Sequence, residues 1–197
     1  MLGIPIGLVV FGIGEWAAHK YVLHGVGGHP DGEPTGALAI HHHRHHQAAR
    51  RNGGYDPAYE GPVWSTSTQR RELLGLAAVG FAHLPLLVVA PFYTSTIWYC
   101  LARYRRDHRR AHLDPAWARD HRPWHYDHHL GDQDKNFGVA WSWFDVLART
   151  REVFVGSDRE RSGRANQVAR AQIASAGAVL RAQRRKRMGT VSLLSRS

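Results

Sequence analysis

Cysteine is almost absent from this chain, which has one thiol, Cys100, among 197 residues. A single cysteine cannot form an internal disulfide, so the chain is not a disulfide-stapled secreted scaffold. The same count excludes zinc sites built on paired cysteines and iron–sulfur sites built on cysteine alone. Signals typical of strands are also few, which favours an all-α fold.

Acidic residues are scarce, with 16 Asp and Glu against 26 Lys and Arg, and the formal net charge is +10. Most of this excess lies between Arg159 and Arg187, where nine basic residues stand against one acid, Glu160. Such a basic tail can bind nucleic acid or an anionic membrane surface, or it can simply be solvated. We find no nucleic-acid module elsewhere in the sequence and expect no nucleic-acid partner.

Two segments are nearly free of charge. Residues 1–18 are apolar except for Glu15 and are roughly long enough for one bilayer crossing. Residues 73–102 contain no Lys, Arg, Asp or Glu. As one helix, this second segment would exceed the ~30 Å hydrocarbon core of a bilayer. Pro85 and Pro91 stand near its middle and would break a helix, so we predict a helical hairpin with two short arms.

Basic residues flank both ends of this hairpin: Arg70 and Arg71 before it, and Arg103, Arg105 and Arg106 after it. Positive flanks usually stay on the cytoplasmic side of a membrane. We therefore expect a multi-pass integral membrane protein with both ends of the hairpin in the cytoplasm. Residues 1–18 either span the membrane or form a re-entrant segment.

The remaining segments are polar. We expect a loop over residues 25–36, a polar helix over 41–51 and a second loop over 52–68, with an Ala-rich surface helix at 165–187 before a disordered end. The predicted class is all-α: an integral-membrane helical bundle with a cytoplasmic, histidine-rich helical cap that holds a dimetal site. The expected domains are residues 1–155 and a basic tail, 156–197.

Histidine is abundant, with fifteen residues, and its spacing is informative. Histidines at i, i+3 and i+4 share one face of a helix, and this pattern occurs twice. An i, i+4 pair and a pair five residues apart add two further groups. The four groups are His42, His45 and His46; His125, His128 and His129; His108 and His112; and His19 and His24.

Each group alone has an ordinary explanation, such as surface polarity, a tag-like run or a pH-sensing cluster. Four separate groups with ligand-like spacing favour a metal site. Ten imidazoles would fill two four-ligand zinc sites with two to spare, or give about five nitrogens to each of two ions with open positions. A bis-histidine haem would leave eight of them unused.

The order of these histidines resembles the fatty acid hydroxylase/sterol desaturase superfamily of membrane di-iron oxygenases. The closing segments HYDHHLGDQDKNFG and WSWFDVLART are similar to the end of that family's pattern. The segment AHKYVLHG is similar to the bacterial β-carotene hydroxylase branch. The resemblance covers about residues 15–150, whereas the tail after Arg151 has no counterpart.

The resemblance implies two iron ions held by the ten histidines; zinc can replace iron in recombinant protein. It assigns His19, His42, His45, His125 and His128 to one ion and His24, His46, His108, His112 and His129 to the other. His121 is an alternative to a member of the 108/112 pair. Spare or structural positions are expected for His29, His41, His43 and His83.

Three further residues match family positions: Asn136, Trp143 and Asp145. We expect the Asp145 carboxylate to orient a ligand histidine through its free ring N–H, as carboxylates near metal sites do. A helix cap or a surface salt bridge is the alternative role for Asp145.

The activity that the resemblance implies is hydroxylation of a lipid C–H bond. The reaction would use O2 and two electrons from a cytochrome b5 or ferredoxin type of donor. A carotenoid hydroxylase and a lipid desaturase on the same centre are the enzymatic alternatives. A histidine-rich membrane protein that stores or senses metal is the non-enzymatic one, although storage tracts need no helical register.

Overall fold

The computed structural model describes residues 2–25 and 37–165, and over these residues the chain is helical with no strand. This agrees with the all-α class predicted above. The chain divides into two units, Met1–Val155 and Gly156–Ser197. Residues 26–36 of the predicted loop, residues 166–187 of the predicted helix, the end expected to be disordered, most of the basic tail and His29 lie outside the described residues. Residue 25, predicted as the start of the loop, instead ends a helix.

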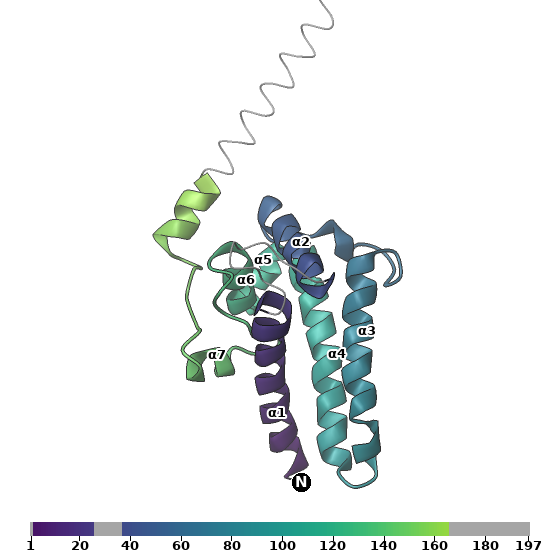
Figure 1. Cartoon of the computed structure of the whole chain (residues 1–197). Helices are drawn as coiled ribbons and strands as arrows, with labels where there is room; N and C mark the ends of the chain where they lie inside the picture. The colour runs from purple at the N-terminus through teal and green to yellow at the C-terminus, as the bar shows by residue number, and fades with distance from the viewer. Residues whose placement is uncertain (1, 26–36, 166–197) are drawn as a thin grey trace, which may run out of the picture. The chain divides into compact units, whose positions relative to one another are not determined.

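Three long helices run side by side in the first unit (Figure 1). Helix α1, Gly3–Ala17, continues without a break as the π-helix η1, Ala18–Gly25. Helix α3, Ser67–Ala82, is joined by the short 3-10 helix η3, Leu84–Leu87, to α4, Pro91–Leu113. Pro85 lies in the connecting turn and Pro91 begins α4, so the uncharged segment is divided into two helical arms near the prolines, as predicted.

Helix α4 extends beyond the predicted end of the apolar arm. It continues past residue 102 to Leu113, so His108 and His112 lie on the same helix as residues of the apolar core. By length and composition alone, one helix among the described residues, Gly3–Gly25, is suited to crossing a bilayer. The multi-pass topology and its orientation therefore stay predictions.

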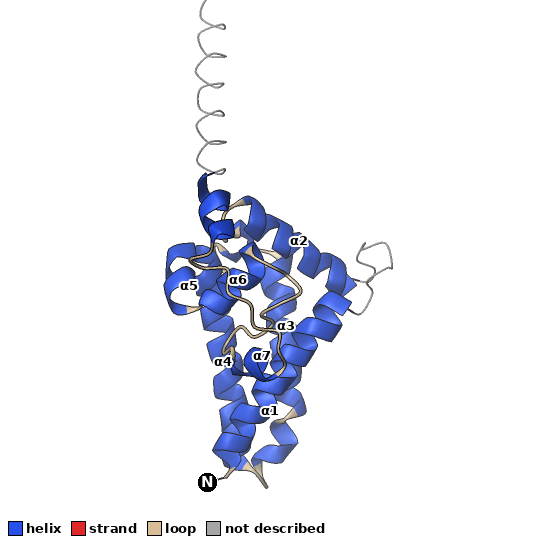
Figure 2. Ribbon diagram, turned by 90° about the vertical axis from the view of Figure 1, so that its left-hand side faces the viewer, coloured by secondary structure: helices blue, strands red, loops and turns tan. Residues whose placement is uncertain are grey.

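Most of the remaining helices gather at one end of these three, opposite the N-terminus and the hairpin turn, whereas α7, Trp143–Leu147, lies beside α1 (Figures 1 and 2). The others are α2, Ala37–Arg51; the 3-10 helix η2, Pro57–Tyr59; α5, Pro115–His121; and α6, Pro123–Leu130. Proline is the first residue of η2, α5 and α6, a position whose N–H makes no hydrogen bond within the helix. Asp114 caps α5 by accepting from the N–H of Trp117.

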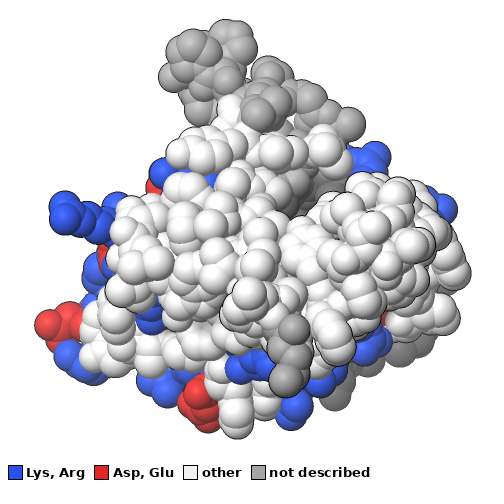
Figure 3. All heavy atoms as spheres, turned by 90° about the horizontal axis from the view of Figure 1, so that it is seen from below, with Lys and Arg blue, Asp and Glu red and all other residues white. Residues whose placement is uncertain are grey.

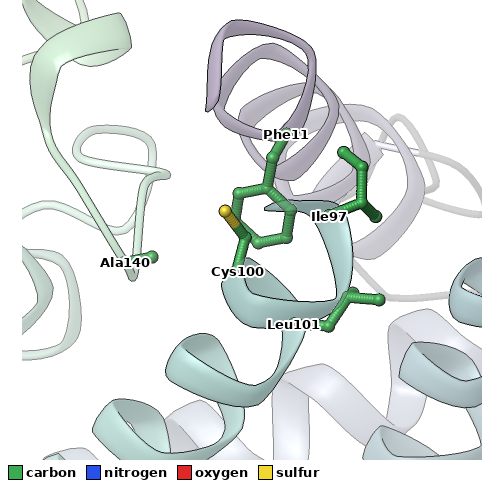
Figure 4. Packing of buried hydrophobic residues seen from close by; sticks show 5 residues of the cluster. All are labelled: Phe11, Ile97, Cys100, Leu101 and Ala140. Carbon is green, nitrogen blue, oxygen red and sulfur yellow. The ribbon is translucent and has the colours of Figure 1, made fainter. Parts of the chain in front are cut away.

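The apolar core joins α1 to α4 (Figure 4). Phe11 of α1 packs with Ile97, Cys100 and Leu101 of α4 and with Ala140. Glycine on α1 permits the close approach: a Cβ at Gly7 would lie 2.8 Å from Thr96 Cβ. At Gly12 it would clash with the indole of Trp143, one of the residues selected from the sequence.

Two glycines of α1 provide a matched test of this packing. Gly12→Ala is expected to lower the free energy of unfolding by about 1–3 kcal/mol, because the new methyl group overpacks against the Trp143 ring. Gly14→Ala should raise it by up to about 1 kcal/mol, because alanine favours helix and nothing lies within 4 Å of the added Cβ. Denaturation of both variants in one detergent measures the difference. Equal stability would contradict the packing described here.

Candidate metal centre

The structure brings all ten predicted ligand histidines together at the end of the bundle. Two groups form, and within each one ligand nitrogen per residue lies within 4.8 Å of all the others. Group A contains His19, His24, His42, His46 and His128, and group B contains His45, His108, His112 and His129. His125 adjoins group B, with its Nε2 atom 3.2 Å from Nε2 of His112.

The two groups share a boundary. The rings of His46 in group A and His129 in group B stack with centroids 4.3 Å apart. Helix α2 supplies both groups, with His42 and His46 on one side and His45 on the other. Helix α6 does the same with His128 and His129. Two adjoining ion sites can therefore be held by the same pair of helices.

The π-helix explains the pair of histidines spaced five apart. A π-helix closes its hydrogen bonds from i to i+5, so residues five apart come close to alignment on one face. His19 and His24 both lie on η1, and their ring centroids are 5.1 Å apart. In an α-helix this spacing would turn one of the two imidazoles away from the cluster.

The division between the two groups differs from the one implied by the resemblance. His24 and His46 lie in group A rather than with His108 and His112. His45 lies in group B, and His125 adjoins group B rather than His19 and His42. Helical periodicity along the chain accounts for eight of the ten and the π-helix for His19 and His24, whereas the division depends on how α2 and α6 face the other helices.

Backbone carbonyls fix the orientation of three of these rings. His19 Nδ1 lies 2.5 Å from the Phe137 oxygen, His128 Nδ1 2.6 Å from the Lys135 oxygen and His112 Nδ1 2.9 Å from the Gly54 oxygen. A carbonyl can only accept, so in each pair Nδ1 carries the hydrogen. The Nε2 lone pairs of these imidazoles therefore face the cluster, as a metal requires.

These lone pairs meet other ring nitrogens. Nε2 of His19 lies 3.2 Å from Nε2 of His42, and Nε2 of His128 lies 3.2 Å from Nε2 of His46. Nε2 of His45 is buried without a hydrogen-bond partner. A cation placed between such buried nitrogens would be bound by lone pairs of both rings. This donor set fits metal ions.

Burial keeps the imidazoles neutral and available as ligands. It lowers the pKa of His42, His46 and His112 well below 6.5, and neighbouring histidines lower it further. Burial is also the main reason why the pKa of His128 falls to about 3. Metal ligation needs unprotonated imidazole, and these residues have that form at neutral pH.

Two carboxylates that sequence reasoning missed support group B. Asp56 Oδ2 lies 2.6 Å from Nδ1 of His45, and Glu72 Oε2 lies 3.3 Å from Nδ1 of His108. The hydroxyl of Tyr59 donates to Glu72 over 2.6 Å. Neither acid lies in a histidine motif. Their signals are weak: Asp56 caps η2 within a loop, and Glu72 directly precedes the uncharged segment.

Asp145 does not act as predicted. Its two carboxylate oxygens accept from the backbone N–H groups of Phe137 and Gly138, and Oδ1 also accepts from the hydroxyl of Thr150. It therefore orients His19 through the Phe137 carbonyl and does not bind a ring N–H itself. Glu15 supports the same loop, since its Oε1 atom accepts from the N–H groups of residues 139 and 140.

Asn136 also shapes this loop. It adopts a left-handed φ of 59°, and its side chain bonds the backbone N–H and C=O of Glu152. Its own N–H donates to the Thr150 oxygen. Asparagine tolerates this conformation better than most residues. The chain reversal that follows places the Phe137 carbonyl against His19.

The other described histidines lie apart from the two groups. His121 stacks on Trp117 and bonds the Trp117 oxygen, so it does not replace a member of the 108/112 pair. His43 is exposed and pairs with Gln47, and His83 bonds the Val79 oxygen at the end of α3. His41 belongs to neither group, although it lines the cavity described next.

A cavity of about 500 Å³ lies next to the histidines, several of which form part of its wall. Its remaining walls come mainly from apolar residues of α1, η1, α3 and α4, including Phe11, Val79 and Leu101. His19 and His42 of group A and His45, His108 and His129 of group B line one side. The volume falls in the range typical of sites for small organic ligands.

Comparison of the chain with protein-family models, with curated proteins and with solved structures gave no match.

Metal content provides the first test of the two groups. The purified protein is expected to bind about two transition-metal ions per chain, because two adjoining sets of four or five nitrogens converge. His128→Ala should lose at least one ion, because it removes a nitrogen from group A. Inductively coupled plasma mass spectrometry measures both values. His121→Ala is the matched control and should keep both ions; equal loss in the two variants would contradict the assignment.

Stability of the metal-free protein should fall as the pH is lowered from about 7 to 5. The buried histidines have folded-state pKa values below the ordinary 6.5. Below pH 6.5 the unfolded chain thus binds protons that the folded chain does not, which favours unfolding. Above this range the contribution is fully present. Chemical denaturation at several pH values measures the slope, and a flat profile would contradict neutral burial.

Proposed function

We propose that this chain is a membrane-bound di-iron oxygenase that hydroxylates a C–H bond of a lipid. One observation carries the proposal: the apolar cavity of about 500 Å³ has histidines of both groups in its wall. A hydrocarbon in this cavity would lie against histidines that could hold the ions. The histidine pattern, similar to that of the fatty acid hydroxylase/sterol desaturase superfamily, supports the same reading.

Iron suits the donor set, since imidazole is a good ligand for iron as well as for zinc and copper. When bound, two irons supply the activation of O2, with two electrons from a cytochrome b5 or ferredoxin type of donor. The chain's own residues hold and orient the ligands. Asp56 and Glu72 contact Nδ1 of His45 and His108, which sets the ring orientation and increases the basicity of the facing nitrogens.

Exclusion of water is the second contribution of the fold. Of the ten proposed ligands, eight are buried, whereas His24 and His42 are partly accessible. The cavity walls away from the histidines are mainly apolar. A dry site strengthens electrostatic interactions and protects reactive intermediates from side reactions. An unactivated hydrocarbon can occupy such a site without displacing ordered polar groups.

The outer surface supports a location in the bilayer. Ile6, Val9 and Ile13 of α1 are exposed, as are Phe81, Val88 and Val89 at the hairpin. Seen from the end with the N-terminus and the hairpin turn, the surface is largely free of charged side chains, which lie mainly around its rim (Figure 3). A large exposed apolar surface of this kind marks a membrane or partner contact. We propose that this end inserts into the bilayer, with the histidine cap in the cytoplasm.

Product analysis tests this function. Iron-loaded protein in lipid nanodiscs, supplied with a chemical reductant and labelled O2, is expected to transfer one labelled oxygen atom to a lipid. His128→Ala should reduce turnover at least about tenfold, because group A loses a nitrogen ligand. Mass spectrometry of extracted lipids detects the label.

His121→Ala serves as the control and should keep turnover close to that of the unaltered chain. A desaturase would instead yield an unlabelled product lacking two hydrogens. A protein that binds two irons yet neither consumes O2 nor changes any lipid would contradict the oxygenase proposal and favour metal storage or sensing.

A further inference from the structure

The uncharged arms of the α3–α4 hairpin are short. Glu72 is the last charged residue of α3, and Arg103 is the first charged residue of α4. From these residues to the helix ends at Ala82 and Pro91, the arms are about 15 and 18 Å long at 1.5 Å per residue. The hydrocarbon core of a bilayer is about 30 Å thick, so each leaflet contributes about 15 Å. The arms are therefore about as long as one leaflet is deep.

Helix α1 offers an uncharged segment of similar length. The helical segment Gly3–Gly25 is long enough to cross a bilayer, but Glu15 interrupts its apolar surface and its last part carries proposed ligands. The uncharged part, Gly3–Gly14, is about 17 Å long. It begins beside the hairpin turn, since an added Cβ on Gly3 would lie 2.7 Å from the backbone nitrogen of Tyr93 (Figure 1).

The hairpin turn has an apolar surface. Residues 80–92 contain no Lys, Arg, Asp or Glu. Val88 is 88% exposed, Val89 77% and Phe81 72%. Seen from this end, charged side chains lie mainly around the rim (Figure 3). A hairpin that crossed the bilayer would return its turn to water on the far side, where such exposed apolar groups are unfavourable.

Side chains satisfy backbone carbonyls at the end of α3. The last carbonyls of a helix have no partner within it, and hydrocarbon offers no water to replace that partner. The Val79 oxygen accepts from Nδ1 of His83 over 2.8 Å, and the Gly80 oxygen accepts from the indole N–H of Trp98 over 3.0 Å. His83, which belongs to neither histidine group, thus has a role at the turn.

Backbone N–H groups of the turn are likewise bonded or absent. Pro85 and Pro91 carry no N–H. The N–H of Leu86 donates to the His83 oxygen over 3.1 Å, and the N–H of Ala90 donates to the Leu86 oxygen over 2.7 Å. A turn in water needs no such internal bonding because solvent satisfies its polar groups. A turn within hydrocarbon does need it, since each unpaired group costs free energy there.

We propose that the chain inserts into a single leaflet, so that the α3–α4 turn lies near the bilayer midplane and does not emerge on the far side. The partner of this surface is the hydrocarbon of one leaflet. Arg70 and Arg106, which are exposed near the other ends of the arms, then lie at the headgroups of that leaflet. This topology differs from the multi-pass one expected from the sequence. It goes beyond the proposed function and needs neither metal nor a reaction.

The depth of fluorescent probes on introduced cysteines tests the proposal. Val88→Cys lies at the turn and Leu74→Cys near the start of the α3 arm, and both positions are exposed. The full-length chain is reconstituted into sealed phosphatidylcholine vesicles that contain phospholipids with a nitroxide quencher. The unaltered chain, whose Cys100 is buried, gives the background.

Nitroxides at the end of the acyl chain should quench the Val88 probe about threefold or more better than headgroup nitroxides do, because acyl ends meet at the midplane. The Leu74 probe should show the opposite order. Val89→Cys, the neighbouring exposed position, repeats the measurement at the turn. Thermal unfolding of each variant shows whether it keeps the fold.

A membrane-impermeant maleimide, supplied on both sides of the vesicle membrane, gives a second measurement. Val88→Cys should not react, because the reagent does not enter hydrocarbon, and it should react once the protein is denatured in detergent. Gln47→Cys is the matched control, since Gln47 is exposed on α2 in the cap. It should react in the intact vesicles.

Two results would overturn the proposal. Reaction of Val88→Cys as fast as Gln47→Cys, with stronger quenching by headgroup nitroxides, would place the turn at an aqueous surface. A Val88 probe that no lipid nitroxide quenches would show that protein, such as a second copy of the chain, covers the turn. Neither result concerns oxygen transfer. The expected depth without a labelled lipid product would reject the oxygenase and keep the single-leaflet insertion.

Discussion

Imidazole nitrogens held with their lone pairs toward a common centre are the constraint on which the rest of this structure depends. The carbonyls of Gly54, Lys135 and Phe137 each fix one ring by accepting from Nδ1. Without these bonds the rings could turn and pair with one another as donor and acceptor. With them, a cation among the rings would satisfy several buried nitrogens at once, so we expect metal binding to be coupled to folding.

The same helices carry both the apolar cavity and the polar ligands. Helix α4 packs Ile97 and Cys100 in its first part and presents His108 and His112 in its second. Helix α1 passes from Phe11 in the core to His19 on the π-helix. On these two helices, a side chain in the cavity is therefore close along the chain to a proposed ligand, whereas α3 lines the cavity without supplying one.

Local periodicity made part of this arrangement predictable. Eight of the ten histidines followed from i, i+3 and i+4 spacing on helices, whereas His19 and His24 share a face only because the chain forms a π-helix there. The hairpin followed from two prolines in an uncharged segment. The division of ligands into two groups did not follow, because it depends on how helices from distant parts of the chain face one another. Asp56 and Glu72 have no characteristic spacing. Asp145 lies near the site as expected, yet it acts through a backbone carbonyl, which leaves no sequence signal.

The loop around Phe137 has a consequence for how the protein is made. His19 lies near the beginning of the chain, but the carbonyl that orients it lies 118 residues later. A ribosome releases the first apolar helix long before it synthesises this partner. The ligand set stays incomplete until α6 has emerged, and the orientation of His19 waits for the loop after it. Any metal that the site takes up would therefore enter it late in biosynthesis, once the loop around Phe137 has formed.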